Sequence, residues 1–342
     1  MAGSGRPTVR DIARHAGVSV ATVSRVTRDD PRVRPETRDR VQASIDSLGY
    51  TPSALGLSLA YQRHNTLGII LPGLGGPYFA ELIQGVESVA VDAGIAVNVL
   101  GTHFRPDAPR AVRQLAMRTD GLVIQAGTVD DDLLTELASS LPVVLVAGTS
   151  DRFASVRTDG LTAERELTEH LIEVHGKREL RFVGDDEAAG DPAARYAGFR
   201  AALAAHGLTE AGPPMRLGLE PEFGARAARD LHAAGDVPEA LVCANDELAF
   251  GLMATLPGLG YSIPRDVAIT GFDDNSLAAL ASPTLTTVHQ PTFELGATAA
   301  GLVLERPREG ARSAQPPISP LAPVDRVLET RAVIRESCGC TA

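Results

Sequence analysis

Apolar side chains in the first fifty residues recur at the spacing of short helices. Positions 9, 12, 13 and 16 share one helical face behind Thr8, a candidate N-cap, and Gly17 ends that helix. Ser19 caps a second helix over 20–27, and a break of this length sets two helices at a steep angle. A third helix is predicted from 35–37, with positions 41, 45 and 48 on one face, up to Gly49.

From residue 66 the pattern changes to continuous apolar runs that alternate with helical stretches. Such runs predict parallel sheets covered on both faces, and two successive series predict two similar α/β lobes. The expected strands are 67–71, 96–100, 121–124, 143–146, 180–183, 240–242 and 267–270. The expected helices are 77–93, 106–117, 130–139, 161–175, 192–206, 224–234 and 246–255.

Composition is that of an ordinary globular protein, with 342 residues, 44% hydrophobic and 22% charged. There is no apolar run of membrane-spanning length and no basic-then-apolar leader, so a cytoplasmic protein without a membrane span is expected. Charge is uneven. Residues 1–63 hold ten Arg against six acidic residues, whereas the remainder holds 22 Lys or Arg against 37 acidic residues. A basic module on an acidic body suits phosphate binding at one end of the chain.

Three cysteines occur, and none predicts a metal site. Cys243 lies in an apolar run and is interpreted as a buried free thiol. Cys338 and Cys340 end the chain, where neighbouring residues offer no further ligands, so an unpaired, frayed tail over 338–342 is expected. No cofactor is expected.

The stretch 8–26, TVRDIARHAGVSVATVSRV, resembles the headpiece of the lactose-repressor (LacI/GalR) family of bacterial transcriptional regulators. The resemblance implies a helix-turn-helix that binds DNA, with Val20 and Ala21 at the positions that read base edges in the major groove. Both are apolar, so they can contact a thymine methyl but donate no hydrogen bond, which leaves Arg25 as the main candidate for a guanine or phosphate contact. The other expected contacts to DNA, mainly to phosphates, are Thr8, Arg10, Ser19, Thr22, Ser24, Arg28, Arg34 and Thr37.

Residues 50–60, YTPSALGLSLA, resemble the hinge helix of this family. The resemblance implies that paired hinge helices enter the minor groove through Ser53 and Ala54 and that Leu59 wedges between base pairs. Gly56 departs from the usual alanine and raises the cost of ordering the helix. A flexible linker is the alternative interpretation of this segment.

The rest of the chain resembles the family's sensor core, which shares the fold of periplasmic sugar-binding proteins. Four segments carry the resemblance, 71–82, 191–199, 244–249 and 271–274, and all follow predicted strands, where open α/β sheets bind ligands. The resemblance implies an effector site for a sugar-like molecule, with Arg195 and Asp273 as its polar anchors and Asp246 as a helix cap instead. The remaining expected effector residues are Leu74, Tyr78, Phe79, Gln125, Phe223, Asn245 and Gln290.

Two departures leave the effector's identity open. Ala147 stands where many sugar-binding members have an aspartate, and Gln125 replaces a common asparagine. The chain has no tryptophan, so any stacking on a sugar ring falls to Tyr78, Phe79 or Phe223.

Competing functions were weighed against the residues. No GxGxxG, P-loop, HExxH or nucleophile elbow is present, which argues against an enzyme. A solute-binding protein with the same core would need an export signal and no headpiece. An RNA-binding role lacks aromatic stacking residues, since Tyr50 and Tyr61 are the only aromatics in the N-terminal module.

The sequence therefore predicts a small all-α helix-turn-helix headpiece and an α/β core of two doubly wound parallel-sheet lobes, periplasmic-binding-protein-like. The expected function is a ligand-responsive repressor that binds a palindromic operator in double-stranded DNA as a homodimer, because no leucine heptad follows Ile334. Whether the effector acts as inducer or corepressor stays open. The expected domains are 1–51 headpiece, 52–63 hinge, 64–160 with 292–322 N-terminal lobe, 161–291 with 323–337 C-terminal lobe and 338–342 tail.

Overall fold

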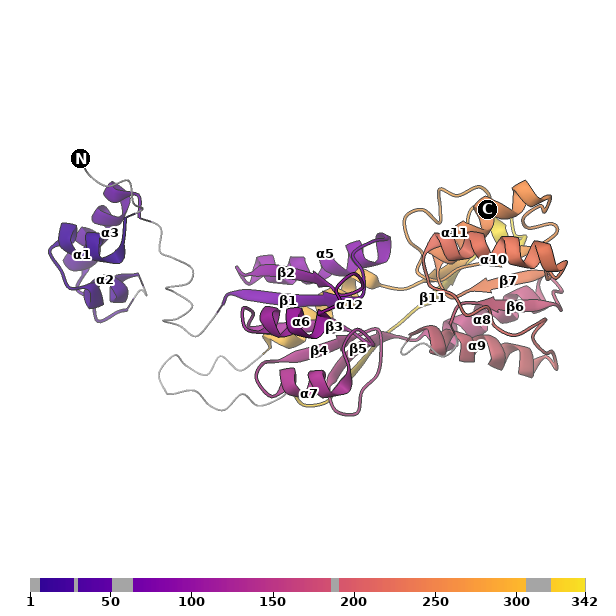
Figure 1. Cartoon of the computed structure of the whole chain (residues 1–342), viewed down its shortest axis with the longest axis horizontal. Helices are drawn as coiled ribbons and strands as arrows, with labels where there is room; N and C mark the ends of the chain where they lie inside the picture. The colour runs from indigo at the N-terminus through magenta and orange to yellow at the C-terminus, as the bar shows by residue number, and fades with distance from the viewer. Residues whose placement is uncertain (1–6, 28–29, 51–63, 186–190, 306–320, 342) are drawn as a thin grey trace. The chain divides into compact units, whose positions relative to one another are not determined.

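The computed structural model describes residues 7–27, 30–50, 64–185, 191–305 and 321–341. The chain divides into two compact units, Met1–His64, which contains the headpiece, and Asn65–Ala342, the core (Figure 1). The whole predicted hinge, 52–63, lies outside the described residues, and with it Ser53, Ala54, Gly56 and Leu59.

Three helices form the headpiece as predicted. They are α1 (Val9–Ala16), α2 (Val20–Val26) and α3 (Pro35–Leu48). Thr8 and Asp11 form a reciprocal capping box at the start of α1, and Gly17 adopts a left-handed conformation (φ 63°) that ends it. Ile12, Val23 and Val41 are fully buried in the core that the three helices share.

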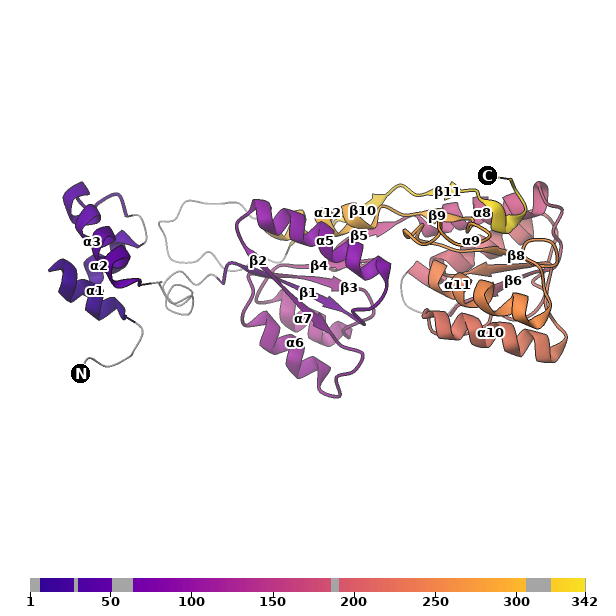
Figure 2. The ribbon, with the colours of Figure 1, turned by 90° about the horizontal axis from the view of Figure 1, so that it is seen from above.

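The N-terminal lobe is built on one six-stranded parallel sheet in the order β10-β5-β4-β3-β1-β2. Helices α5 and α12 cover one face and α6 and α7 the other (Figure 2). The strands are β1 (Thr66–Leu71), β2 (Ala96–Gly101), β3 (Gly121–Gln125), β4 (Val143–Val146), β5 (Ala154–Thr158) and β10 (Asp325–Leu328). The helices are α5 (Pro77–Asp92), α6 (Ala108–Ala116), α7 (Asp131–Ala138) and α12 (Thr292–Leu304).

The C-terminal lobe has a three-stranded parallel sheet in the order β6-β7-β8. Helix α8 packs against α9, and α10 packs against α11, on the two sides of this sheet (Figure 2). The strands are β6 (Leu180–Val183), β7 (Ala240–Cys243) and β8 (Ala268–Thr270). The helices are α8 (Gly160–Glu173), α9 (Asp191–Ala205), α10 (Pro221–Ala234), α11 (Asp246–Thr255) and the short 3-10 helix Leu256–Leu259.

The chain crosses between the lobes three times, from β5 to α8, from β9 (Thr287–His289) to α12, and from β10 to β11 (Arg331–Val333). Strands β9 and β11 pair antiparallel. The prediction that residues 323–337 belong to the C-terminal lobe is wrong for β10, which pairs with β5 in the N-terminal sheet. Its position is fixed by Asp325, which accepts hydrogen bonds from Ser155 and Arg157.

The C-terminal segment is ordered by hydrogen bonds, and the prediction of a frayed tail is wrong. A short 3-10 helix, Glu336–Cys338, packs on the C-terminal lobe with Ser337 and Cys338 buried. The Ser337 hydroxyl donates to the Ile269 carbonyl at 2.6 Å and accepts from the Thr286 backbone N–H at 2.8 Å. Within the described ranges, no helix has the length and apolar character needed to cross a membrane.

Candidate DNA-binding and effector sites

The second helix of the headpiece presents the predicted reading positions to solvent. Val20, Ala21 and Arg25 are exposed on α2, while Val23 and Val26 face the headpiece core. This division follows from helical spacing. Val23 and Val26 are three residues apart and share the buried face, so Ala21 and Arg25 lie on the opposite, exposed face. Helix α2 thus exposes two apolar side chains and one cation at the positions predicted to read DNA, and their contacts to DNA stay a prediction.

The residues expected to contact phosphates divide into two groups. Ser19 caps α2 by accepting the Thr22 N–H, and its hydroxyl also lies 2.9 Å from that of Thr22. Thr8 is committed to the capping box with Asp11, so its hydroxyl already has an acceptor. Arg10 and Arg34 are exposed, while Thr37 and Ser24 are half-buried. Arg28 lies outside the described residues.

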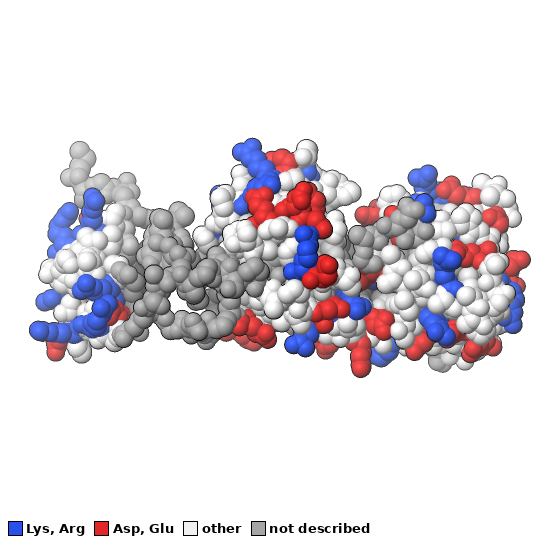
Figure 3. Space-filling view, turned by 90° about the horizontal axis from the view of Figure 1, so that it is seen from below, with Lys and Arg blue, Asp and Glu red and all other residues white. Residues whose placement is uncertain are grey.

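Basic side chains gather on the headpiece. On the face drawn in Figure 3, blue side chains dominate the small unit, whereas blue and red are mixed over the core. One acid is neutralised locally, because Arg32 forms a 2.7 Å ion pair with Asp30 that holds the pKa of this carboxyl well below its usual range. The headpiece can therefore attract a polyanion although the whole chain is acidic.

A buried polar cluster forms where strands of the two lobes end. Arg195, on the first turns of α9, is 5% exposed, and its guanidinium lies 3.6 Å from Asp191 and 3.9 Å from Asp273. The guanidinium also stacks on Phe272, 3.8 Å from the ring centroid. Gly160 at the start of α8 permits this approach, because a Cβ there would meet the Arg195 side chain at 3.3 Å.

Several atoms of this cluster have no hydrogen-bond partner among the described residues. They come from both lobes: Asp191 Oδ2 and Arg195 Nε from the C-terminal lobe, and Tyr78 Oη and Gln125 Oε1, which lie near each other without the geometry of a hydrogen bond, from the N-terminal lobe. Tyr78 is within electrostatic range of Asp191 and Asp273, so the two lobes meet here. A buried polar atom without a partner costs about 1–3 kcal/mol, which marks a place where a polar ligand or water is accommodated.

Burial shifts the ionisation of this cluster toward neutral acids. It raises the pKa of Asp273 well above the ordinary value and also raises that of Asp191, and Arg195 offsets part of both shifts. Burial likewise raises the pKa of the Tyr78 phenol, which stays protonated. One permanent cation thus faces two carboxyls and a phenol, a set that can both donate to and accept from hydroxyl groups.

Asp273 also has an unusual backbone. Its φ of 130° and the φ of 56° at Asp274 are rare for residues with a Cβ, and they occur directly after β8. Gln290, at the crossing from β9 to α12, donates from Nε2 to Asp273 Oδ1 and accepts from Thr158 Oγ1 at 3.1 Å. Since Thr158 ends β5, this chain of bonds joins two crossings between lobes to the buried cluster.

Asn245 has the helix-capping role that the sequence predicted for Asp246. Asn245 caps α11, accepting the Leu248 N–H with Oδ1, and donates to the Leu219 carbonyl with Nδ2. The prediction that Asp246 caps this helix is wrong. It is buried inside the first turn and accepts from Thr287 Oγ1 and the Asn275 N–H. Asn245 precedes the helix with extended backbone, which is the geometry that a cap requires.

The three apolar residues predicted at the effector site have different surroundings. Leu74 is 56% exposed in the loop after β1. Phe79 packs on the N-terminal core and edge-on against Tyr78, and Phe223 packs on the C-terminal core. A separate cavity of about 360 Å³ opens between the lobes. Its lining is mainly apolar and includes Pro77 of the N-terminal lobe and Phe250 and Ala281 of the C-terminal lobe.

Sequence reasoning missed Asp191 and Thr158 as members of the cluster. Asp191 opens the matched segment 191–199, so its position at the start of a helix beside Arg195 was a usable signal. No local pattern points to Thr158, because its role depends on Gln290, which is 132 positions away.

Comparison with known proteins resolves the family. Residues 8–53 match the model of "Bacterial regulatory proteins, lacI family", and residues 168–338 match that of the "Periplasmic binding protein-like domain". The chain is 34% identical over 312 residues to the HTH-type transcriptional repressor PurR of Photobacterium profundum, covering 88% of this chain and 92% of that protein. The chain belongs to the LacI family.

Solved structures of LacI-family regulators share the fold. A complex of the transcriptional regulator CelR with cellobiose superposes with a TM-score of 0.70 at 27% identity, covering 97% of this chain and all of that chain. A lac repressor dimer bound to operator and the anti-inducer ONPF gives a TM-score of 0.81 at 23% identity, covering 98% and 99%. At that identity the second likeness supports the fold alone.

As a LacI-family member, the chain is a DNA-binding transcriptional regulator with a periplasmic-binding-protein-like core. The alternative of a solute-binding protein is not supported, because the DNA-binding family model matches the headpiece itself. The relatives are transcriptional regulators and not enzymes.

Proposed function

We propose that this LacI-family chain is a repressor that binds a palindromic operator as a homodimer and responds to a small polyhydroxylated effector held between its lobes. The observation that carries the proposal is the set of unpartnered buried polar atoms at the lobe junction, from Tyr78, Gln125, Asp191 and Arg195. A ligand that supplies their missing hydrogen bonds stabilises the arrangement in which both lobes contact it.

The chemistry of the cluster suits hydroxyl groups. Arg195 offers a fork of donors, and Asp191 and Asp273 lie 3.6 and 3.9 Å from it. Because burial favours the protonated form of both acids, each can donate to a hydroxyl as well as accept from one, and the guanidinium can donate to the same hydroxyl groups. The related CelR was solved as a complex with cellobiose, a molecule of this class.

Gln290 joins the buried cluster to the crossings between the lobes. Its amide links Asp273, in the buried cluster, with Thr158, at the end of β5 in the N-terminal lobe. A ligand that moves Asp273 therefore changes a hydrogen bond between two crossings, and the relative angle of the lobes changes with it. Rotation of lobes about such crossings is a common form of switching in two-lobed proteins.

Dimerisation is supported by apolar side chains left exposed on the N-terminal lobe. Strand β2 is an edge strand of its sheet and Val99 on it is 39% exposed, while Val91 at the end of α5 is 67% exposed. The lac repressor, which shares this fold, was solved as a dimer on its operator. Two headpieces on a symmetric dimer match two half-sites of a palindrome.

The same proposal makes the chain a regulator without catalytic activity, acting in the cytoplasm where operator DNA lies. A binding role accounts for the buried cluster, because a closed set of hydrogen-bonding groups serves to recognise a ligand.

The test combines ligand and DNA measurements. A thermal-shift screen of sugars, sugar phosphates and nucleobases identifies the effector, since a ligand at a hundred times its Kd stabilises the folded state by about 2.7 kcal/mol. Selection from random duplexes supplies the operator. Arg195→Ala should abolish the thermal shift and leave operator affinity within about threefold. A ligand that shifts wild type and Arg195→Ala equally would contradict this site.

A further inference from the structure

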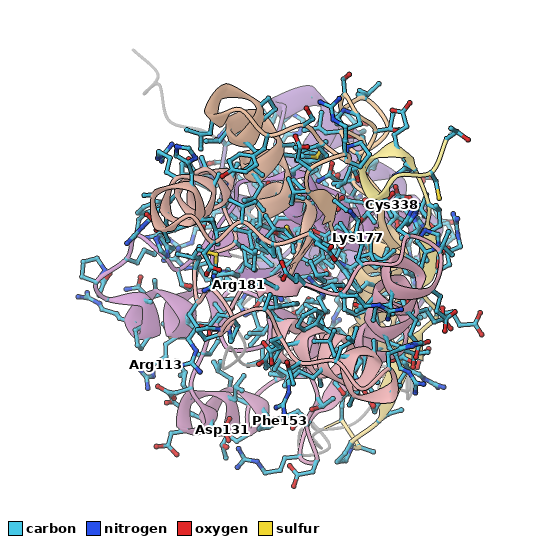
Figure 4. The ribbon with its side chains drawn as sticks, turned by 90° about the vertical axis from the view of Figure 1, so that its right-hand side faces the viewer. Arg113, Asp131, Phe153, Lys177, Arg181 and Cys338 are labelled. Atoms are coloured by element: carbon cyan, nitrogen blue, oxygen red, sulfur yellow. The ribbon has the colours of Figure 1, made fainter. Side chains whose placement is uncertain are left out.

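The C-terminal segment carries a cluster of soft ligand atoms outside the DNA-binding and effector sites. His170 lies in the last turn of α8, and His175 follows that helix. Cys338 ends the last 3-10 helix, and Cys340 comes two residues later. Figure 4 looks onto this end of the core, with Cys338 labelled on the yellow C-terminal segment.

The four ligand atoms face one another. Cys340 Sγ lies 3.6 Å from His170 Nε2 and 3.4 Å from His175 Nε2, and Cys338 Sγ lies 3.7 Å from His170 Nε2. All four ligand atoms are within 4.8 Å of one another. No other such group occurs in the described ranges of the chain.

These distances match the edges of a zinc tetrahedron. Zn–S bonds of about 2.3 Å and Zn–N bonds of about 2.0 Å at tetrahedral angles separate S from N by about 3.5 Å. Two thiolates with two imidazoles are a ligand set that zinc prefers, and four protein ligands leave no open position for a substrate. The arrangement is therefore that of a structural site.

The backbone between the two cysteines suits metal binding. Gly339 has a φ of 116°, which turns the chain between the two cysteines, and a Cβ there would lie 3.0 Å from the His175 ring.

We propose that His170, His175, Cys338 and Cys340 bind one zinc ion that fixes the C-terminal segment to the end of α8. The two thiols lose their protons to solvent on binding, and no bond to carbon changes. Zinc then secures the segment whose Arg335 donates to Asp274 at 2.7 Å, beside Asp273 of the effector cluster.

Metal content gives the first test. Protein purified without a polyhistidine tag, incubated with zinc and dialysed, should hold one zinc ion per chain by elemental analysis. Cys338→Ser with Cys340→Ser, and separately His175→Asn, should lose it. Matched controls are Cys243→Ala, which alters the thiol buried in β7, and His103→Asn, which alters an exposed imidazole, and both should keep zinc.

Cobalt replacement tests the geometry in wild-type protein, where folding of a variant is not an issue. Cobalt added to metal-free protein should give the strong visible bands of a tetrahedral ion and thiolate-to-cobalt charge transfer in the near ultraviolet. Zinc should raise the melting temperature of wild type and not that of the double cysteine variant. A wild-type chain without bound zinc, a weak octahedral cobalt spectrum, or a Cys338–Cys340 disulfide in freshly purified protein would overturn the proposal.

Discussion

Glu164 is a buried carboxyl in α8 without a hydrogen-bond partner. Its side chain is 0% exposed, and neither carboxylate oxygen has a partner among the described residues. Burial raises its pKa to about 8, and the attraction of Arg195 offsets only part of this. The folded protein therefore keeps this carboxyl protonated at neutral pH, whereas the unfolded chain ionises it near pH 4.5.

The stability contributed by this protonated group depends on pH. It is fully present below the unfolded pKa and is lost as pH rises through the folded value, so the free energy of unfolding should fall between about pH 5 and pH 8. One ionising group gives a slope of up to about 1.4 kcal/mol per pH unit. Glu164→Gln, which keeps shape and neutrality, should flatten this slope and exceed wild type in stability at pH 8.

Urea unfolding of the core, followed by circular dichroism across this pH range, measures the effect. Glu166→Gln is the matched control, because Glu166 is exposed on the same helix and should leave the slope unchanged. Parallel pH profiles for wild type and Glu164→Gln would show that Glu164 is ionised in the folded state.

Among the elements, recognition helix α2 could be predicted fully from its sequence. Ser19, the buried Val23 and Val26, and the break at Gly17 are local signals, so boundaries and exposed face both follow. If α2 reads the operator as proposed, few polar groups on it are available for base contacts, because Val20 and Ala21 are apolar and exposed. Sequence preference at those positions should then follow thymine methyl groups.

Arg25→Ala should reduce operator affinity by about 1–3 kcal/mol, or roughly tenfold to over a hundredfold, and leave effector binding unchanged. Fluorescence anisotropy against salt concentration resolves the role. Loss of a phosphate contact reduces the salt slope by about one, whereas loss of a base contact relaxes sequence preference instead. Arg229→Ala, the same charge change on α10 of the core, is the control. Equal affinities for the two variants would exclude Arg25 from the interface.

Other elements could not be predicted, and the reasons are physical. Helix α12 (Thr292–Leu304) packs against both α5 and the sheet, so its apolar and small residues show no clear polar face. Strands β9 and β11 have three residues each, and β10 is a largely exposed edge strand. Their pairing depends on partners far along the chain. The cluster of His170, His175, Cys338 and Cys340 was missed for the same reason, since its halves are more than 160 residues apart.

For the whole molecule, the two-lobed architecture followed from the alternation of strands and helices, but the hydrogen bonds that join the buried cluster to the crossings between the lobes did not. Arg195, Asp273, Tyr78, Gln125 and Gln290 were all expected near the effector, and the structure brings them to one junction. That Gln290 bonds to both Thr158 and Asp273 emerges only when two crossings meet in space. The sequence therefore predicts which residues lie in this buried cluster, but it does not predict which hydrogen bonds join them.

The hydrogen bonds of Gln290 predict that this residue couples effector binding to operator binding, whereas Gln125 contributes to effector affinity alone. Operator and effector must change each other's affinity by the same factor, and coupling of 1–3 kcal/mol corresponds to about 5- to 150-fold. Gln290→Ala breaks the link between Thr158 and Asp273, so it should reduce this factor to below about threefold while both ligands still bind. Gln125→Ala removes a group at the junction that bonds to no crossing, so it should weaken effector binding and preserve the factor.

Titrating effector with and without saturating operator, by calorimetry or intrinsic fluorescence, gives the factor directly for each protein. Reciprocity is checked by titrating operator with and without effector. The sign of the change also distinguishes an inducer, which lowers operator affinity, from a corepressor, which raises it. If Gln290→Ala keeps the wild-type factor, the signal passes between the lobes by another route, and the hydrogen bonds at Gln290 serve only to hold the fold together.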